Sequence, residues 1–162
     1  MSLDPRRIDV LDVLDDQERR NALDAIGRVL TPDGLLLMSS HNRAFAPRIA
    51  SPWHLRGKGR RARLRSLNRL PRWWWNRQRV LPFEVSEQSY AVLNDISQDF
   101  AALHYYITRN AQERQLAEHG FELLECLDLD GRPVGPEDEM ADCAELHYVA
   151  RRARTMLEEP AA

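Results

Sequence analysis

Residues 15–42 constrain the fold most, because they predict a helix, a turn and a strand in unbroken succession. Asp15 and Asp16 supply an N-cap and favourable charge at the start of a helix. Apolar residues then recur at helical spacing until a Pro-Asp-Gly turn ends the helix: Ala22, Leu23, Ile26, Val29 and Leu30. The continuous apolar run at 35–38 predicts a strand that is covered on both faces. The segment predicts an α/β sheet with ligands near residues 39–42, because such sheets bind ligands beyond the carboxyl ends of their strands.

The remaining pattern predicts one more helix and several strands. Asn110 is the expected N-cap of a helix over 111–119, and Gly120 stands where a helix commonly ends. Strands are expected at four places: 90–93, 104–108, 121–127 and 146–150.

Composition indicates a folded chain without a membrane-spanning segment. Of the 162 residues, 43% are hydrophobic and 30% charged, which separates the chain from disordered sequences. No apolar run approaches the roughly 18 residues that span a bilayer, and the amino terminus has no signal-peptide core. We therefore expect a cytoplasmic protein. Cys126 and Cys143 lack metal-ligand spacing, so we expect two buried thiols and no metal site.

Charge is distributed unevenly along the chain. Residues 34–83 contain twelve Lys and Arg and no Asp or Glu, whereas the rest has eleven cations and twenty-five acids. The two parts therefore carry net charges of +12 and −14. This distribution favours an anionic partner for the basic region at residues 53–79, or neutralisation of one part of the protein by the other.

The helix-turn-strand segment also carries a family resemblance. The run R-V-L-T-P-D-G-L-L-L at 28–37 resembles the helix, turn and strand 5 of class I S-adenosylmethionine-dependent methyltransferases, where R-V-L-K-P-G-G precedes an apolar strand. The Ser-His-Asn sequence at 40–42 and later blocks at 90–95, 104–107 and 115–121 resemble one bacterial branch of that family. The resemblance implies methyl transfer from S-adenosylmethionine to a small or anionic acceptor.

The resemblance also implies the organisation of the chain. We expect an α/β fold with a partial Rossmann-like methyltransferase sheet, in which equivalents of strands 5, 6 and 7 accompany a helical basic insert. The expected parts are a helix and strand-5 segment at 1–42, a basic, tryptophan-rich insert at 43–102, the last helix and closing hairpin at 103–151, and a tail at 152–162. The family's glycine-rich cofactor loop has no counterpart in this sequence. We therefore expect a truncated domain that is inactive alone and can dimerise through an unpaired edge of strand 5.

Candidate site residues come from position and from the resemblance. His41 ends the strand-5 equivalent, and the ordinary pKa of histidine near neutrality makes it the candidate general base. The resemblance implies a cofactor-contacting acid before the first helix, and Asp9 and Asp12 both suit that position. Asn42 would position a substrate or cap a helix that follows it. Further substrate-binding candidates rest on the resemblance or on the basic insert: Asn94, Asp95, His104, Tyr105, Tyr106, Arg60, Arg61 and Trp74.

The basic insert has several interpretations. A basic amphipathic helix is predicted over 60–70, Pro71 is expected to end or kink it, and three consecutive tryptophans begin at Trp73. The segment suits a lid whose arginines clamp an anionic substrate, a helix on a membrane surface, or a strip that follows nucleic acid. Alternatively, the tryptophans fill a small core and the arginines face solvent. A non-catalytic binding module for anionic polymers or membranes is therefore the alternative to a methyltransferase.

Overall fold

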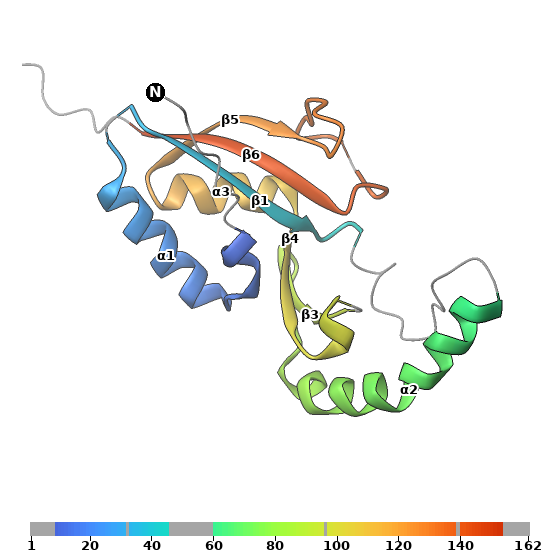
Figure 1. Ribbon diagram of the computed structural model, residues 1–162. Coiled ribbons are helices and arrows are strands. Elements are labelled where there is room, and N and C mark those ends of the chain that lie inside the picture. Colours follow the sequence, from blue (N-terminus) through green and yellow to red (C-terminus); the bar gives the residue numbers. More distant parts are fainter. Residues whose placement is uncertain (1–8, 32, 46–59, 96, 139, 154–162) are drawn as a thin grey trace, which may run out of the picture.

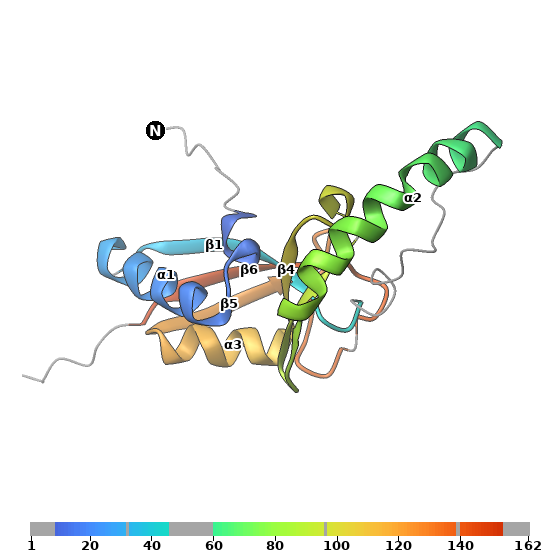
Figure 2. The same ribbon diagram turned by 90° about the horizontal axis from the view of Figure 1, so that it is seen from below.

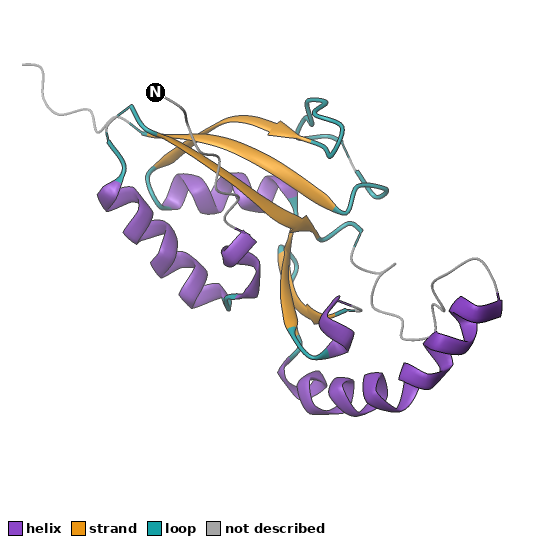
Figure 3. Ribbon diagram, in the orientation of Figure 1, coloured by secondary structure: helices purple, strands orange, loops and turns teal. Residues whose placement is uncertain are grey.

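The computed structural model describes residues 9–31, 33–45, 60–95, 97–138 and 140–153. The chain is a mixed α/β protein with a six-stranded sheet in the order β2-β3-β4-β1-β6-β5 (Figure 1). The strands are β1 (Leu35–Asn42), β2 (Val85–Ser86), β3 (Tyr90–Asn94), β4 (Leu103–Ile107), β5 (Phe121–Leu127) and β6 (Glu145–Arg152). The helices are α1 (Asp16–Val29), α2 (Arg60–Val80), α3 (Arg109–Glu118) and the 3₁₀ helices η1 (Asp9–Val13), η3 (Leu81–Phe83) and η4 (Ser97–Phe100) (Figure 3).

Helix α1 and the turn after it form as the sequence predicts. The Asp15 side chain accepts a hydrogen bond from the Glu18 backbone, and the Glu18 carboxylate accepts one from the Asp15 backbone. This capping box satisfies backbone N–H groups that the first helical turn leaves unpaired. In the turn, a Cβ atom on Gly34 would lie 2.6 Å from Cγ of Leu30. The close approach of the helix end to β1 therefore requires glycine at this position.

Strand β1 is longer than the predicted apolar run, and the apolar residues at 35–38 are covered on one face only. Leu36 and Met38 are buried in the main core, whereas Leu35 and Leu37 are 51% and 62% exposed. The expectation that both faces are covered is therefore wrong for the described residues. The reason is that α1 and α3 both contribute to the core that contains Leu36 and Met38, and the side chains of a strand alternate between faces.

The sheet also contains strands that belong to the predicted insert. Strands β2, β3 and β4 form an antiparallel series, and β4 joins β1 in parallel through the pairs His41 with Tyr106 and Asn42 with Ile107. The carboxyl end of β1 therefore has a strand partner on the side where an unpaired edge was expected. Among the described residues, no strand pairs with residues 35–40 on that side. Dimerisation through this remaining edge stays a prediction.

The closing part of the fold follows the prediction, except for the helix cap. Strand β6 lies antiparallel to both β1 and β5, which gives the expected closing hairpin. Helix α3 begins two residues earlier than predicted, because the N-cap is Thr108, whose hydroxyl accepts from the Ala111 backbone. The Asn110 side chain instead donates to the carbonyl of Pro136. Gly120 follows the helix with a φ of +77°, a conformation that favours glycine.

Helix α2 does not end at Pro71, one of the two outcomes predicted there, and only one of its three consecutive tryptophans is buried. The helix continues through Pro71 to Val80 and bends along its length (Figure 1), as expected where proline removes a backbone donor. Trp73 is 4% exposed, packs edge-on against Phe100 and donates from Nε1 to Asp99 at 2.9 Å. The interpretation of a small tryptophan core therefore holds for Trp73 and fails for its two exposed neighbours.

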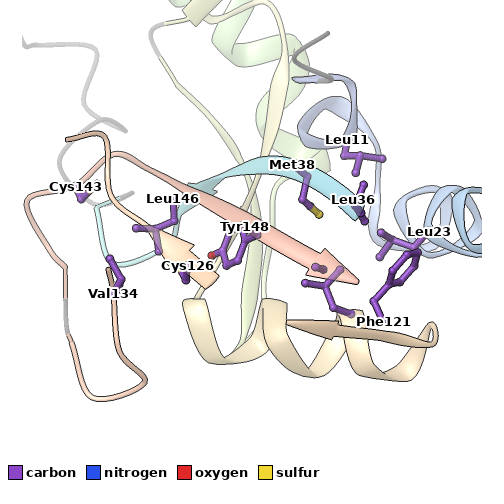
Figure 4. Close-up of a cluster of buried hydrophobic side chains, with 12 residues drawn as sticks. Leu11, Leu23, Leu36, Met38, Phe121, Cys126, Val134, Cys143, Leu146 and Tyr148 are labelled. Atoms are coloured by element: carbon purple, nitrogen blue, oxygen red, sulfur yellow. The ribbon is translucent and has the colours of Figure 1, made fainter. Parts of the chain in front are cut away.

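The main core joins α1, α3, β1, β5 and β6 (Figure 4). Its largest members come from different elements and meet between the helices and the sheet: Leu23, Leu36, Met38, Leu116, Phe121, Leu146 and Tyr148. Tyr148 is 1% exposed, and its hydroxyl has no hydrogen-bond partner among the described residues. Burial raises the pKa of this phenol well above its usual value, so the hydroxyl stays protonated.

We expect Tyr148→Phe to leave the free energy of unfolding unchanged or to raise it by up to about 1 kcal/mol, because the substitution removes a buried hydroxyl without a partner. Urea denaturation at pH 7 measures the change. Tyr106→Phe is the matched control and should destabilise the protein, since the Tyr106 hydroxyl donates to Asp95. A larger loss of stability for Tyr148→Phe than for Tyr106→Phe would contradict the prediction.

Candidate active site

Three elements bring titratable side chains together at the carboxyl end of β1. His41 lies in the last two residues of β1, directly beside Tyr106 of β4 in the sheet register. Asp12 reaches the same place from η1. His104 precedes Tyr106 by two residues on β4, so the two side chains share one face of that strand. The sequence prediction that a site forms around 39–42 therefore coincides with a real cluster of ionisable groups.

Asp12 fixes the position of this strand end. Its carboxylate accepts from the Arg19 Nη1 at 3.0 Å, from the Ser40 hydroxyl at 2.8 Å and from the His41 backbone N–H at 2.9 Å. Asp12 is only 6% exposed. The carboxylate is therefore held mainly by neighbouring protein groups. Among the described residues, Oδ2 accepts one hydrogen bond, from the His41 backbone N–H, and it has acceptor capacity left for His41 or a ligand.

Arg19 is the fully buried partner of Asp12. Its guanidinium donates to Asp12, to the Leu11 carbonyl and to the Ser40 hydroxyl. It also donates to the side-chain carbonyls of two α3 residues, Gln112 at 2.6 Å and Gln115 at 3.0 Å. The guanidinium carbon lies 4.7 Å from the ring centroid of Tyr105. One side chain of α1 thereby connects η1, β1, β4 and α3 beneath the candidate site.

The imidazole of His41 is the accessible member of the cluster. Its side chain is 28% exposed, and Nε2 lies 3.9 Å from Oδ2 of Asp12. The ring stacks on Tyr106 with centroids 5.1 Å apart and meets His104 edge-on at 5.5 Å. The ring is thus held on two sides while one part faces solvent. Such an imidazole can accept a proton from a bound molecule, and Asp12 is close enough to stabilise the imidazolium that forms.

Tyr106 and Asp95 lie on the β4 side of the cluster around His41. The Tyr106 hydroxyl donates to Oδ2 of Asp95 at 2.5 Å, and both residues are buried. Burial and the bond to Asp95 raise the pKa of Tyr106, so its phenol stays protonated at neutral pH. Tyr106 therefore serves as a fixed stacking surface for His41 and not as a second base.

His104 is a buried neighbour with an unusual environment. It is 7% exposed, and its Nε2 has no hydrogen-bond partner among the described residues, although Oδ1 of Asp95 lies 3.9 Å away. Burial lowers the pKa of His104 below its usual 6.5; Asp95 and Asp12 oppose this effect, and His41 adds to it. His104 is therefore neutral at pH 7, which keeps a second positive charge away from His41.

This lowered pKa predicts a loss of stability in mild acid. As the pH falls below about 6.5, the unfolded chain takes up the proton at His104 before the folded chain does, so the free energy of unfolding decreases. In His104→Gln that contribution is absent, and the decrease between pH 7 and pH 5 should become smaller. Urea denaturation across this pH range measures both proteins. Equal pH dependence in the two would contradict the prediction.

Several predicted site residues lie in other roles or places. The Asn42 amide donates to the carbonyls of Met140 and Cys143, and its oxygen accepts from Ala44, so the side chain holds the chain after β1. Asn94 is fully buried and donates to the carbonyls of Phe100 and Ala102.

Tyr105 points away from His41, since alternate residues of β4 face opposite sides, and its hydroxyl donates to Asp16 at 2.6 Å. Burial, together with the bond to Asp16, raises the pKa of Tyr105. Trp74 is exposed on α2. The side chains of Asp9, Arg60 and Arg61 lie outside the described set. The structure thus gathers His41, Asp12, His104, Tyr106 and Asp95, and it gives Asn42, Asn94, Tyr105 and Trp74 other roles or places.

Sequence reasoning missed Arg19, although a signal for it was present. Arg19 precedes Leu23 by four residues and Ile26 by seven, so it occupies the apolar face of α1. A charged residue on such a face indicates a buried partner. Asp12 stands seven residues before it, and the pair spans the capped start of the helix.

Other features of the described residues add no chemistry to this cluster. Among them, no group of three or more His, Cys, Asp or Glu is arranged to hold a metal ion. Cys126 and Cys143 are buried free thiols, as predicted, and burial raises the pKa of Cys126 to about 11. None of the helices in the described ranges combines the length and apolar character needed to cross a bilayer. An open hollow of about 480 Å³ lies between residues 128–130 and 140–143, and His41 is not among its lining residues.

Three solved methyltransferase structures are similar to the chain. The 1,6-didemethyltoxoflavin-N1-methyltransferase of Burkholderia thailandensis, solved with 1,6-didemethyltoxoflavin and S-adenosylhomocysteine, has a TM-score of 0.47 and 12% identity over 89% of this chain and 40% of its own. The CcbJ methyltransferase of Streptomyces caelestis has a TM-score of 0.45 and 12% identity, over 95% of this chain and 61% of its own. A SAM-dependent methyltransferase of Methanosarcina mazei has a TM-score of 0.41 and 13% identity, over 89% of this chain and 55% of its own.

The chain thus spans between 40% and 61% of the length of these structures. No family model matches the chain, and no curated protein matches it in sequence. Its own strand order defines it as a mixed α/β protein with a six-stranded sheet.

Proposed function

We propose that this chain forms the acceptor side of an S-adenosylmethionine-dependent methyltransferase site. The observation that carries the proposal is the His41 imidazole, which is partly exposed at the carboxyl end of β1 while Asp12, Tyr106 and His104 around it are buried. That is the position where open α/β sheets place ligands. The likeness of residues 28–37 to the strand-5 segment of class I methyltransferases supports the same assignment.

The described residues do not fit a complete site for the methyl donor. Asp12, a predicted cofactor contact, already accepts three hydrogen bonds from its own chain. The described glycines with positive φ, Gly120 and Gly131, lie at the end of α3 and in the turn after β5, away from His41 in sequence and sheet position. Residues outside the described set, or another polypeptide, would have to hold S-adenosylmethionine. A direct contact from Asp9 or Asp12 stays a prediction.

The role of His41 follows from its surroundings. The acceptor is a small molecule whose nucleophilic nitrogen or oxygen carries a proton, and the imidazole of His41 accepts that proton. Asp12, 3.9 Å away, stabilises the resulting imidazolium, and Tyr106 holds the ring plane by stacking. Neutral His104 avoids repulsion of the new positive charge. The protein therefore contributes alignment and proton removal, the two requirements that methyl transfer places on its acceptor side.

Isothermal titration with S-adenosylmethionine and radiolabelled methyl transfer to a pool of small N–H and O–H acceptors test the proposal. Two proteins are compared: the 162-residue chain and the same chain carrying any natural coding sequence upstream of Met1. We expect no heat for the 162-residue chain, and micromolar donor binding with methyl transfer for the longer protein. In the longer protein, His41→Asn should remove methyl transfer and leave donor binding unchanged.

Asn110→Ser is the matched control, because Asn110 lies on the surface beside Pro136 and not in the cluster. It should leave both measurements unchanged. Micromolar donor binding by the 162-residue chain would overturn the half-site assignment. Full methyl transfer by His41→Asn, or no donor binding by either protein, would overturn the proposed function.

A further inference from the structure

The segment from α2 to β2 exposes an unusual amount of apolar surface. Trp74 and Trp75 are 62% and 61% exposed, and Phe83 is 66% exposed. Leu81 and Val85 are 38% and 40% exposed. Five of the eleven exposed large hydrophobic side chains in the described residues therefore fall within residues 74–85. Such a concentration on a surface commonly marks an interaction site.

Helix α2 presents Trp74 and Trp75 away from the side that packs on the rest of the protein. Trp73 points inward, against Phe100, and Asn76 donates to the Asp99 carbonyl on the same side. Since each residue advances about 100° around an α-helix, Trp74 and Trp75 are turned by about 100° and 200° from the packed side. Figure 2 shows α2 extending outward from the sheet, so this side of the helix is open to a large partner.

The same helix is strongly basic. Its 21 residues contain eight arginines and neither aspartate nor glutamate. Arg72, at 72% side-chain exposure, lies on the flank opposite Trp74 by helical geometry, and Arg79 lies seven residues further on the same flank. Trp75 lies about 60° from Arg72 and about 40° from Arg79 around the helix, so a partner that contacts this side of α2 meets an aromatic ring and guanidinium groups together.

We propose that α2 and the following residues to Val85 dock on the surface of an anionic phospholipid bilayer. Arginines contact the headgroups, and Trp74, Trp75 and Phe83 enter the interface, where aromatic rings partition favourably. The net charge of −14 outside residues 34–83 orients the molecule, because an anionic surface attracts the basic segment and repels the remainder.

The exposed aliphatic side chains within residues 74–85 favour lipid over nucleic acid as the partner. Trp74 and Trp75 would suit base stacking as well as a bilayer, but Leu81 and Val85 gain nothing from phosphates or from the polar edges of bases. Each gains free energy by entering an acyl layer. The combination of aliphatic, aromatic and arginine side chains on one exposed segment therefore matches an interfacial lipid surface best.

Vesicle co-sedimentation of the full chain tests this proposal. We expect binding to phosphatidylcholine vesicles containing phosphatidylglycerol, weak binding to pure phosphatidylcholine, and a blue shift of tryptophan emission on binding. The double variant Trp74→Ser/Trp75→Ser should reduce the partition coefficient by about tenfold or more. Val29→Ser is the matched control, since Val29 is 82% exposed on α1, and it should bind like the unchanged protein.

A second variant separates the electrostatic contribution from folding defects. Arg72→Gln/Arg79→Gln should weaken binding and make it less sensitive to salt, because fewer charges then interact with the headgroups. Circular dichroism of each variant verifies that the fold is intact. Absence of binding to the anionic vesicles, or unchanged binding of the tryptophan variant, would overturn the proposal. Retention of single-stranded DNA without vesicle binding would overturn it in favour of nucleic acid.

Discussion

Replacing Arg19 with leucine is expected to lower the free energy of unfolding by about 3–5 kcal/mol, the size typical for breaking a buried ion pair from one side. Arg19 has no exposed surface, and its guanidinium makes five hydrogen bonds, four to side chains and one to the Leu11 carbonyl. Its loss leaves the Asp12 carboxylate buried without its cation, together with unpaired amide oxygens on Gln112 and Gln115. Urea denaturation at pH 7 measures the change.

Arg20 provides a control one residue away on the same helix. Its guanidinium pairs with Asp16 at 2.9 Å and Glu118 at 2.6 Å, but its side chain is 35% exposed and Glu118 is 56% exposed. Exposed ion pairs contribute little, so Arg20→Gln should cost at most about 1 kcal/mol. Equal losses for the Arg19 and Arg20 variants would show that the buried network adds no more stability than a surface pair.

The double variant Asp12→Leu/Arg19→Leu distinguishes a stabilising ion pair from a positioning one. Removing both charges avoids the unpaired carboxylate, and replacement of a whole buried pair by apolar residues is often neutral. If stability recovers while the His41 signals in an NMR spectrum still change, the pair serves mainly to position the strand end. Asp12 then acts on His41 through the backbone N–H that it accepts.

The parts of the fold that sequence predicts are those with local signals. The Asp15 cap and the helical spacing of α1 act within a few residues, and the structure reproduces both. After the helix, the Gly34 backbone donates to the Thr31 carbonyl, as a local turn requires. The same holds for β5 and for Gly120, whose positive φ reflects a local backbone requirement. The same reasoning predicts that His41 lies at the end of a strand, and the structure places it near the end of β1.

The parts that sequence misses depend on contacts between distant segments. The bond between Tyr106 and Asp95 and the contacts of Arg19 with α3, 93 and 96 residues away, have no periodicity that reveals them. The exposure of Leu35 and Leu37 was missed for a related reason. An apolar run predicts burial, but which face is covered depends on where α1 and α3 pack.

Replacing Leu23 with alanine is expected to lower the free energy of unfolding by about 2–5 kcal/mol, because the change leaves a cavity in the main core. Leu23 is 0% exposed and belongs to the same cluster as Leu36 and Phe121. Val29→Ala on the same helix is the control. Val29 is 82% exposed, so its effect should stay within about 0.5 kcal/mol. Thermal and urea unfolding of both variants measure the difference. Similar small losses for both would show that α1 is not packed on β1 as described. The Asp12 and Arg19 pair would then have no rigid support beneath His41, because α1 carries Arg19 to the strand end.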